Sequence, residues 1–188
     1  VLIIVVLQGC ASQVEHTNEP AQKAVSYASK SVPESLQKSF QKAIALQAKG
    51  EIGQAKQAFE TLHETYPKFS GAAINLALLS MAKDPNQASA YLKQAIERNA
   101  NNYYAYTLLG VLARQANDFE TAKGYYERTV EIEPTYANAW YNLAVLNEVY
   151  LGNFSEAIQA YETLLVLDQS DEKKIKKRIQ KLKKPKEE

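Results

Sequence analysis

Small, large apolar and aromatic residues recur at fixed positions along the chain, with a period of 34 residues. Between positions 103 and 136, period positions 4, 7, 8, 17, 20, 24 and 32 are Tyr106, Leu109, Gly110, Phe119, Ala122, Tyr126 and Pro134. A period of about 20–50 residues indicates stacked copies of one supersecondary unit. The period constrains the fold more than any other feature because it sets the size and number of those units.

Three further segments follow the same spacing, and their length changes fall in turns. The next segment has Trp140, Leu143 and Ala144 in register, then Phe154, Ala157 and Tyr161 displaced by one residue near Leu151-Gly152-Asn153. The preceding segment has Leu76, Ala77, Ala88, Leu92 and Ala95, and is one residue shorter at Asp84-Pro85-Asn86. The first has Ala43, Gly50, Ile52, Ala55, Phe59 and Pro67. We therefore predict four repeats, at 36–69, 70–102, 103–136 and 137–171.

This pattern resembles the tetratricopeptide repeat (TPR) family, in which each unit is a pair of antiparallel helices. The resemblance implies an all-α fold, a TPR α-solenoid of four helix-turn-helix repeats plus a C-terminal capping helix. Small residues at period positions 8 and 20 would let the two helices of a unit approach closely. Composition agrees, because 26 Ala against only 7 Gly and 6 Pro favours helix.

Both ends of the array carry capping signals. At the C-terminus, residues 172–188 form a predicted basic capping helix and tail, with Ile175, Ile179 and Leu182 on one apolar stripe. At the front, Ser31-Val32-Pro33-Glu34 has capping-box spacing with Pro in the first turn, which predicts the start of the first helix.

The amino terminus resembles a bacterial lipobox. Val1 to Leu7 is an apolar run too short to cross a bilayer, which needs about 20 residues, and it is typical of the apolar part of an export signal. Leu7-Gln8-Gly9-Cys10 follows, and Cys10 is the only Cys in the chain. We expect residues 1–9 to be a truncated lipoprotein signal segment, and residues 10–35 to be a lipidated Cys10 and its tether. The alternative is a buried strand that ends in an inert thiol.

The lipobox resemblance also implies a location. Ala11 rather than Asp follows Cys10, which in enterobacterial lipoproteins is associated with sorting to the outer membrane. We expect a lipid-anchored protein on the periplasmic face of the outer membrane, or a cell-surface lipoprotein in a Gram-positive cell.

In TPR proteins, period positions 2, 5, 9 and 12 point into a concave groove that binds a protein or peptide. Here these positions are Gln37, Phe40, Ile44, Gln47, Gly71, Ile74, Leu78, Met81, Tyr104, Thr107, Val111, Arg114, Asn138, Tyr141, Val145 and Glu148. The set lacks the Lys and Asn residues that clamp a C-terminal carboxylate in chaperone-binding TPR domains, so an apolar or amphipathic peptide is the expected ligand. Alternatively, these side chains are inter-repeat core or are covered by the chain's own segment 20–35.

The charge pattern divides the chain. Residues 171–188 hold nine Lys or Arg and four Asp or Glu, so this tail is +5 and the rest of the +1 chain is −4. The tail could contact anionic lipid head groups or an acidic partner, or it could be a solvated cap. Nucleic acid is not expected as a partner, because the overall charge is near zero.

Catalysis has no support in the sequence. His16 and His63 lie 47 residues apart, and no zinc-protease, serine-hydrolase or phosphate-loop motif is present. We therefore expect neither an enzyme nor a metal site or cofactor. The expected function is a scaffold for protein–protein interaction in envelope assembly, and small TPR lipoproteins of this kind include the pilotin-like proteins of type IV pilus and secretin biogenesis. The alternatives are a regulator of a peptidoglycan synthase or hydrolase, and a self-associating structural protein.

Overall fold

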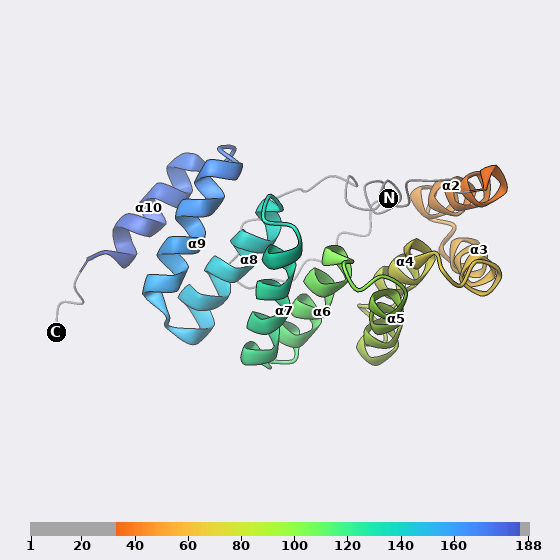
Figure 1. The fold of residues 1–188 in the computed structure, drawn as a ribbon, viewed down its shortest axis with the longest axis horizontal. Coiled ribbons are helices and arrows are strands. Elements are labelled where there is room, and N and C mark those ends of the chain that lie inside the picture. The colour runs from red at the N-terminus through yellow and green to blue at the C-terminus, as the bar shows by residue number, and fades with distance from the viewer. Residues whose placement is uncertain (1–32, 185–188) are drawn as a thin grey trace. The chain divides into compact units, whose positions relative to one another are not determined.

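The computed structural model describes residues 33–184, and all elements in that range are helices, labelled as in Figure 1. The helices are α2 (Glu34–Ala48), α3 (Ile52–Thr65), α4 (Ser70–Ser80), α5 (Pro85–Arg98), α6 (Tyr103–Gln115), α7 (Phe119–Ile132), α8 (Ala137–Leu146), the π-helical η1 (Asn147–Leu151), α9 (Phe154–Leu167) and α10 (Glu172–Leu182). Four helix pairs and one terminal helix confirm the predicted fold class. Cys10 and the signal segment lie outside the described residues.

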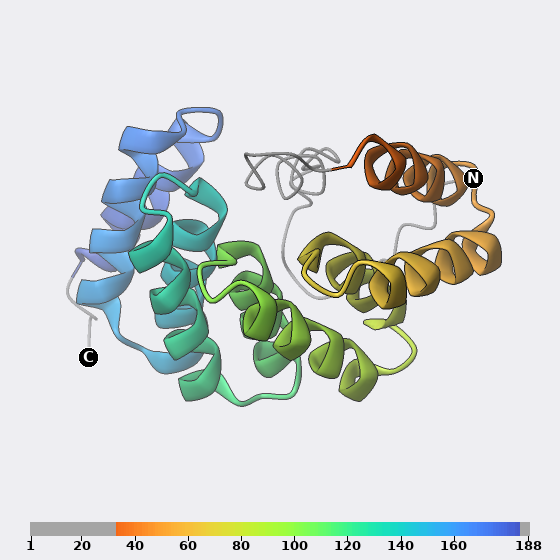
Figure 2. The same cartoon turned by 45° about the vertical axis from the view of Figure 1, so that its right-hand side comes forward.

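The helices form two compact units that divide between Ala100 and Asn101. The first unit holds the pairs α2/α3 and α4/α5, and α3 also packs on α4. The second holds α6/α7 and α8/α9, with α7 packed on α8 and α10 packed on α9. Figure 2 shows the helices of the second unit side by side in chain order. The division falls within two residues of the predicted boundary between the second and third repeats.

The core of the first unit is built around aromatic rings and small residues. Phe40 meets Phe59 and Phe69 edge to face, with ring centroids 5.7 and 5.1 Å apart. Ala43 and Ala55, at period positions 8 and 20, are both fully buried. These alanines allow the close helix approach that the TPR resemblance implies.

In the second unit, a glycine lies where the first helix pair crosses. A Cβ atom added to Gly110 would lie 2.5 Å from Cε1 of Tyr126, and the Tyr126 side chain is fully buried. The Tyr126 ring therefore occupies the space that any larger residue at position 110 would need.

The terminal helix seals the second unit. Ile175 and Ile179 of α10 are buried against Tyr161 and Leu164 of α9, and Leu182 packs beside them. The apolar stripe predicted from the sequence is thus the inner face of α10, which confirms its role as a capping helix.

Helix boundaries follow local chemistry. The side chains of Asp84, Asn102 and Asp118 each accept a hydrogen bond from the backbone three residues ahead and cap α5, α6 and α7. The start of α2 differs from the prediction, since Pro33 occupies the N-cap position and Glu34 is the first helical residue. Pro33 therefore precedes the first turn, where its fixed φ and missing N–H do no harm. Ser31 lies outside the described residues.

The turn inside each pair explains the unequal repeat lengths. In each pair, the backbone N–H of the residue before the second helix donates to a carbonyl in the first helix or at its end. That carbonyl lies five residues back in the first and third repeats, four in the second and six in the fourth. The bonds are Glu51 to Leu46 (3.0 Å), Asp84 to Ser80 (2.8 Å), Asp118 to Ala113 (2.9 Å) and Asn153 to Asn147 (2.9 Å). The extra residue of the fourth repeat was predicted near Leu151-Gly152-Asn153. The structure absorbs it one turn earlier, in η1, because a π turn takes up one additional residue without breaking the helix.

Candidate functional site

In the first unit, some of the predicted groove residues are buried in the core and others reach the surface. Phe40 and Ile74 are buried, with exposed fractions of 4% and 0%. Ile44 packs against the core cluster around Phe59 and is half-buried, as is Leu78, whereas Gln37 is exposed. Phe40 and Ile74 therefore act as packing residues in this unit, which is the alternative that the sequence left open for them.

In the second unit, the groove positions on α6 range from buried to half-buried. Thr107 is buried, and its hydroxyl donates to the carbonyl of Tyr103 (2.9 Å), with the Thr129 hydroxyl 3.3 Å away. Its hydroxyl is satisfied internally, so Thr107 is a structural residue. Tyr104 and Arg114 are half-buried. Burial, with a smaller contribution from Tyr136, raises the pKa of Tyr104 to about 12, so this phenol remains a neutral donor at physiological pH.

The remaining groove positions of the second unit lie on α6, α8 and η1, and all are half-buried. They are Val111, Asn138, Tyr141, Val145 and Glu148. Tyr141 and Val145 pack against the cluster that holds α10, and Val111 packs beside Tyr126. These side chains therefore contribute to packing and to the surface at once. The groove itself stays a prediction.

Glu148 is the groove residue with the most specific surroundings. Its carboxylate accepts hydrogen bonds from the Tyr161 hydroxyl (2.7 Å) and from Nε of Arg178 (2.9 Å). The Arg178 guanidinium also lies over the Tyr161 ring, 5.6 Å from its centroid. Burial and the hydrogen bond to Glu148 both raise the pKa of Tyr161, so the phenol remains protonated and donates. The three side chains tie η1, α9 and α10 together.

The sequence analysis places Glu148, Tyr161 and Arg178 in three separate groups and does not predict that they contact one another. Tyr161 belongs to the repeat pattern, Arg178 lies in the predicted basic capping helix, and Glu148 is a predicted groove position. The one-residue insertion was the available signal, because π turns are frequent at functional sites.

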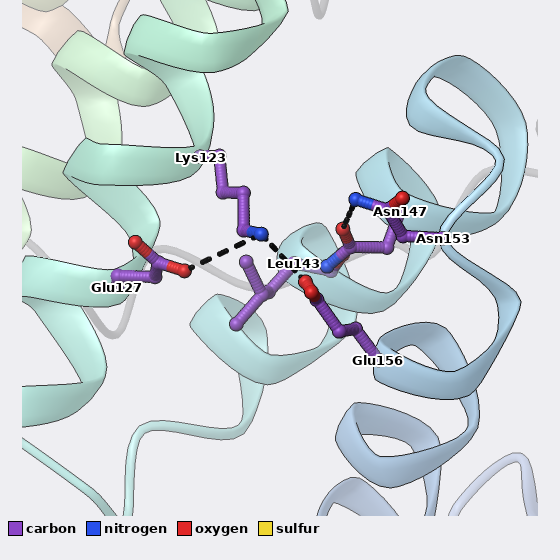
Figure 3. A network of polar contacts seen from close by, with 6 residues as sticks. All are labelled: Lys123, Glu127, Leu143, Asn147, Asn153 and Glu156. Carbon is purple, nitrogen blue, oxygen red and sulfur yellow. Dashed lines mark hydrogen bonds and ion pairs between the residues drawn. The ribbon is translucent and has the colours of Figure 1, made fainter.

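A polar network holds the π turn in place (Figure 3). The Asn147 amide donates to the carbonyl of Leu143 (3.1 Å), and the Asn153 amide donates to the Asn147 side-chain oxygen (3.4 Å). Beside them, Lys123 of α7 pairs with Glu156 of α9, with a nitrogen–oxygen distance of 2.6 Å. The hydrogen bond to Glu156 raises the pKa of Lys123. This network joins the second helices of successive repeats.

His63 lies on α3 and contacts α5 of the same unit. Its ring nitrogens lie 2.8 Å from the Gln94 side-chain oxygen and 2.6 Å from Nη1 of Arg98. Burial, together with the Arg98 charge, lowers the pKa of His63. Within residues 33–184, no group of three His, Cys, Asp or Glu side chains has the geometry to hold a metal ion.

Two hollows open on the surface of the units. One, of about 490 Å³, lies between α2 and α3, and its lining includes Lys42, Gln57 and Tyr66. The other, of about 580 Å³, lies between Glu148 and α10. Glu148 is the only predicted groove residue that lines either one. Among the helices described, none is both long and apolar enough to span a membrane.

Comparison with known proteins gives matches to sequence and to fold. Residues 39–68 match one family model described as a tetratricopeptide repeat, and residues 82–137 and 109–172 match another with the same description. Superkiller complex protein 3 of Homo sapiens is 30% identical over 93 residues, which cover 48% of this chain and 6% of that protein. The Mus musculus protein is 33% identical over 66 residues, 35% of this chain and 4% of that protein. The chain thus spans only a small part of these relatives.

Three solved structures are similar in fold. A MamA crystal structure has a TM-score of 0.66 at 21% identity, with 79% of this chain and 81% of that chain covered. MamA of Desulfovibrio magneticus has a TM-score of 0.66 at 14% identity, with 81% and 85% covered. PilF of Pseudomonas aeruginosa has a TM-score of 0.67 at 16% identity, with 87% and 69% covered. At these identities the likeness establishes the fold alone.

The repeat geometry, the small residues at the helix crossings and the family models agree with one another. The matched segments, 39–68 and 82–172, together take in more than half of the 188 residues. The chain belongs to the tetratricopeptide repeat family.

Proposed function

We propose that this chain is a non-catalytic scaffold for protein–protein interaction, anchored by a lipid on Cys10 and active in envelope assembly such as type IV pilus or secretin biogenesis. Membership of the tetratricopeptide repeat family is the observation that carries the proposal. Repeats of this family bind protein or peptide partners in a groove formed by the first helices of successive pairs, and such helices are present in both units.

The groove residues that best suit partner contact are Tyr104 and Arg114 on α6. Both are half-buried, and an amphipathic aromatic ring and a guanidinium are the side chains most enriched at energetically important interface positions. Burial lowers the pKa of Arg114, but the interactions with the hydroxyls of Tyr126 and Tyr150 raise it by more. The pKa therefore lies above its usual value, and the side chain stays cationic.

The lipid anchor is supported by the sequence Leu7-Gln8-Gly9-Cys10 after an apolar run. Attachment through acyl chains on Cys10 would place the repeats at the periplasmic face of the outer membrane. The likeness to PilF of Pseudomonas aeruginosa is a likeness of fold, so the identity of the envelope machine has to come from the partner itself.

Membrane fractionation tests the anchor. Replacing Cys10 by Ala removes the only thiol, so we expect the protein to move from the membrane fraction to the soluble fraction, whereas the matched Ser12→Ala variant stays in the membrane. Retention of the Cys10→Ala protein in membranes would refute lipid anchoring.

Photo-crosslinking in intact cells tests the scaffold role. A photoreactive amino acid in place of Tyr104 or Arg114 should capture a partner, and the same amino acid at Thr121, which is exposed on α7, should not. A captured secretin or pilus subunit supports the proposal. A peptidoglycan synthase or hydrolase supports the regulator alternative, and a second copy of this chain supports self-association. Equal capture at all three positions rules out the α6 surface as the binding site.

A further inference from the structure

One side of α10 borders a hollow of about 580 Å³ in the second unit. The lining residues are Glu148, Lys174, Lys177, Arg178, Gln180, Lys181 and Lys184. Five of the seven side chains are cationic and one is acidic. A recess with this lining concentrates positive potential, because the low-dielectric wall keeps solvent from screening it fully.

The single carboxylate in the hollow does not neutralise the lysines. Glu148 already accepts hydrogen bonds from Arg178 at 2.9 Å and from Tyr161 at 2.7 Å. Within residues 33–184, no carboxylate lies within 4.0 Å of the ammonium groups of Lys177, Lys181 or Lys184. The described part of the chain therefore supplies no acidic partner to these three ammonium groups.

Two other lysines at this end of the chain show the opposite arrangement. Lys176 pairs with Glu172, and Lys183 pairs with Glu162 of α9 at 2.9 Å. Both of these lysines have acidic partners within the chain. Of the lysines that line the hollow, Lys174 also has one, Asp171 at 3.9 Å, whereas residues 33–184 offer no carboxylate within 4.0 Å of Lys177, Lys181 or Lys184. Net positive charge that a fold leaves uncompensated in a recess is a feature of binding sites for anionic groups.

We propose that this basic hollow binds an acidic peptide segment of a partner protein, whose carboxylates pair with Lys177, Lys181 and Lys184. The inference rests on the proposed role in protein binding, but it concerns a surface other than the α6 groove positions and can be tested separately. Charge complementarity selects the ligand: a segment rich in Asp and Glu.

The spacing of the lysines fits such a segment. Lys177 and Lys181 are four residues apart on α10, about 6 Å along the helix axis, and Lys184 lines the same hollow two residues after the helix ends at Leu182. Carboxylates about 6–7 Å apart, on alternate residues of an extended peptide or on successive turns of a helix, would reach these ammonium groups in sequence.

A membrane surface fits the hollow less well. Helices that lie on bilayers insert an apolar face between the lipids. The apolar residues Ile175 and Ile179 of α10 are instead buried in the core of the second unit. The lining of the hollow contains only charged side chains and Gln180, so this side of α10 has no apolar residue to insert into a bilayer. A recessed site also makes fewer contacts with a flat layer of head groups than a protruding one would.

Fluorescence anisotropy with the purified full chain tests the proposal. The probe is a fluorescein-labelled ten-residue peptide of alternating Glu and Ser, and its control replaces each Glu by Gln. We expect saturable binding of the Glu peptide only. The triple variant K177Q/K181Q/K184Q should lose at least about tenfold in affinity at moderate salt, because three charge-assisted contacts are removed.

A matched triple variant, K173Q/K176Q/K183Q, removes the same charge from the same helix outside the hollow. We expect its affinity to change by less than about threefold, as longer-range charges are screened at moderate salt. Circular dichroism melting verifies that both variants fold. Equal weakening by the two triple variants would overturn the proposal in favour of diffuse electrostatic attraction.

Two further outcomes would also overturn it. One is the absence of saturable binding to the Glu peptide. The other is binding to vesicles of phosphatidylglycerol and phosphatidylcholine that needs the three lysines while binding to the peptide does not, which would assign the hollow to a membrane. None of these results bears on the Cys10→Ala fractionation or on crosslinking from position 104, so failure here is distinguishable from failure of the proposed function.

Discussion

The third and fourth repeats place opposite charges at the same period position. Position 12 is Arg114 in the third repeat and Glu148 in the fourth, and each lies beside the buried Tyr of its own repeat, Tyr126 or Tyr161. In the fourth repeat a third member, Arg178 of α10, completes the group. A carboxylate at this position therefore gives the basic α10 helix a polar contact with η1, beside the apolar packing of Ile175 and Ile179. The comparison shows that one position of the repeat can serve either a neighbouring repeat or the end of the array.

The two repeats also differ by one residue in the turn. The third closes with a hydrogen bond over five residues and has Asn117 at φ 61°, whereas the fourth closes over six through the π turn and has Gly152 at φ 70°. Both turns thus contain one residue in the left-handed region, Asn117 or Gly152, although the turn of the fourth repeat is longer. The second helix begins two residues after it in both repeats, at Phe119 and at Phe154, so the added residue is absorbed before the turn.

The largest expected effect breaks the helix crossing of the third repeat. Gly110→Ala would place a Cβ 2.5 Å from the buried Tyr126 ring, and we expect a loss of about 1–3 kcal/mol in the free energy of unfolding. The fourth repeat already has Ala144 at the equivalent position. Urea denaturation followed by circular dichroism measures the change.

Gly124→Ala is the matched control in the same repeat. A Cβ at Gly124 meets nothing within 4 Å, so the better helix propensity of Ala should raise stability by up to about 1 kcal/mol. If both substitutions were stabilising, the crossing at Gly110 would have room that the structure does not show.

The next largest effect compares substitutions at period position 12 in the fourth and third repeats, Glu148 and Arg114. Glu148→Gln keeps the size but removes the charge that Arg178 and Tyr161 share, and we expect a loss of about 1.5 kcal/mol. A double-mutant cycle with Arg178→Gln should show coupling of about 1 kcal/mol. Arg114→Gln has no such partner on α10, so its cycle with Arg178→Gln should show none. Additivity in both cycles would mean that Glu148 does not hold α10.

A smaller effect tests the left-handed turn residue. Gly152→Ala should cost about 1 kcal/mol because a Cβ is disfavoured at φ 70°. At the matching place in the third repeat, Asn117→Gly should be neutral or stabilise by a few tenths of a kcal/mol, since Asn tolerates this region better than most residues. Thermal melts of the two variants would contradict this if they shifted in the same direction.

The smallest effect concerns pH and the first unit. Because the folded-state pKa of His63 lies below 6.5, the unfolded chain binds a proton first as pH falls through 6.5. The free energy of unfolding should therefore decrease below about pH 6.5 and level off once pH passes the lower folded-state pKa. The difference in stability between wild type and His63→Gln, followed from about pH 7.5 to 5, should decline with acidity. A flat difference would show that His63 titrates alike in both states.

Much of the fold could be predicted from the repeat spacing, and parts of the site could not. Ala43, Ala55, Gly110 and Ala122 mark the helix crossings because only small side chains fit there, and a fixed period makes that visible in the sequence. The exposed or buried state of Phe40, Ile74 and Thr107 was not predictable in the same way. Period position defines the direction of a side chain, but neighbouring helices determine whether it reaches the surface.

By itself, the sequence determined the all-α repeat fold, the four helix pairs and the apolar stripe of the capping helix, because each depends on periodic placement of small or apolar residues along one helix. Only the tertiary structure decided that Glu148, Tyr161 and Arg178 meet, and that Lys177, Lys181 and Lys184 line a common hollow with no acidic partner among residues 33–184. Those relations join side chains up to 30 residues apart across separate helices. The packing of η1 and α10 on α9 sets them, and the repeat period does not specify which side chains of separate helices meet.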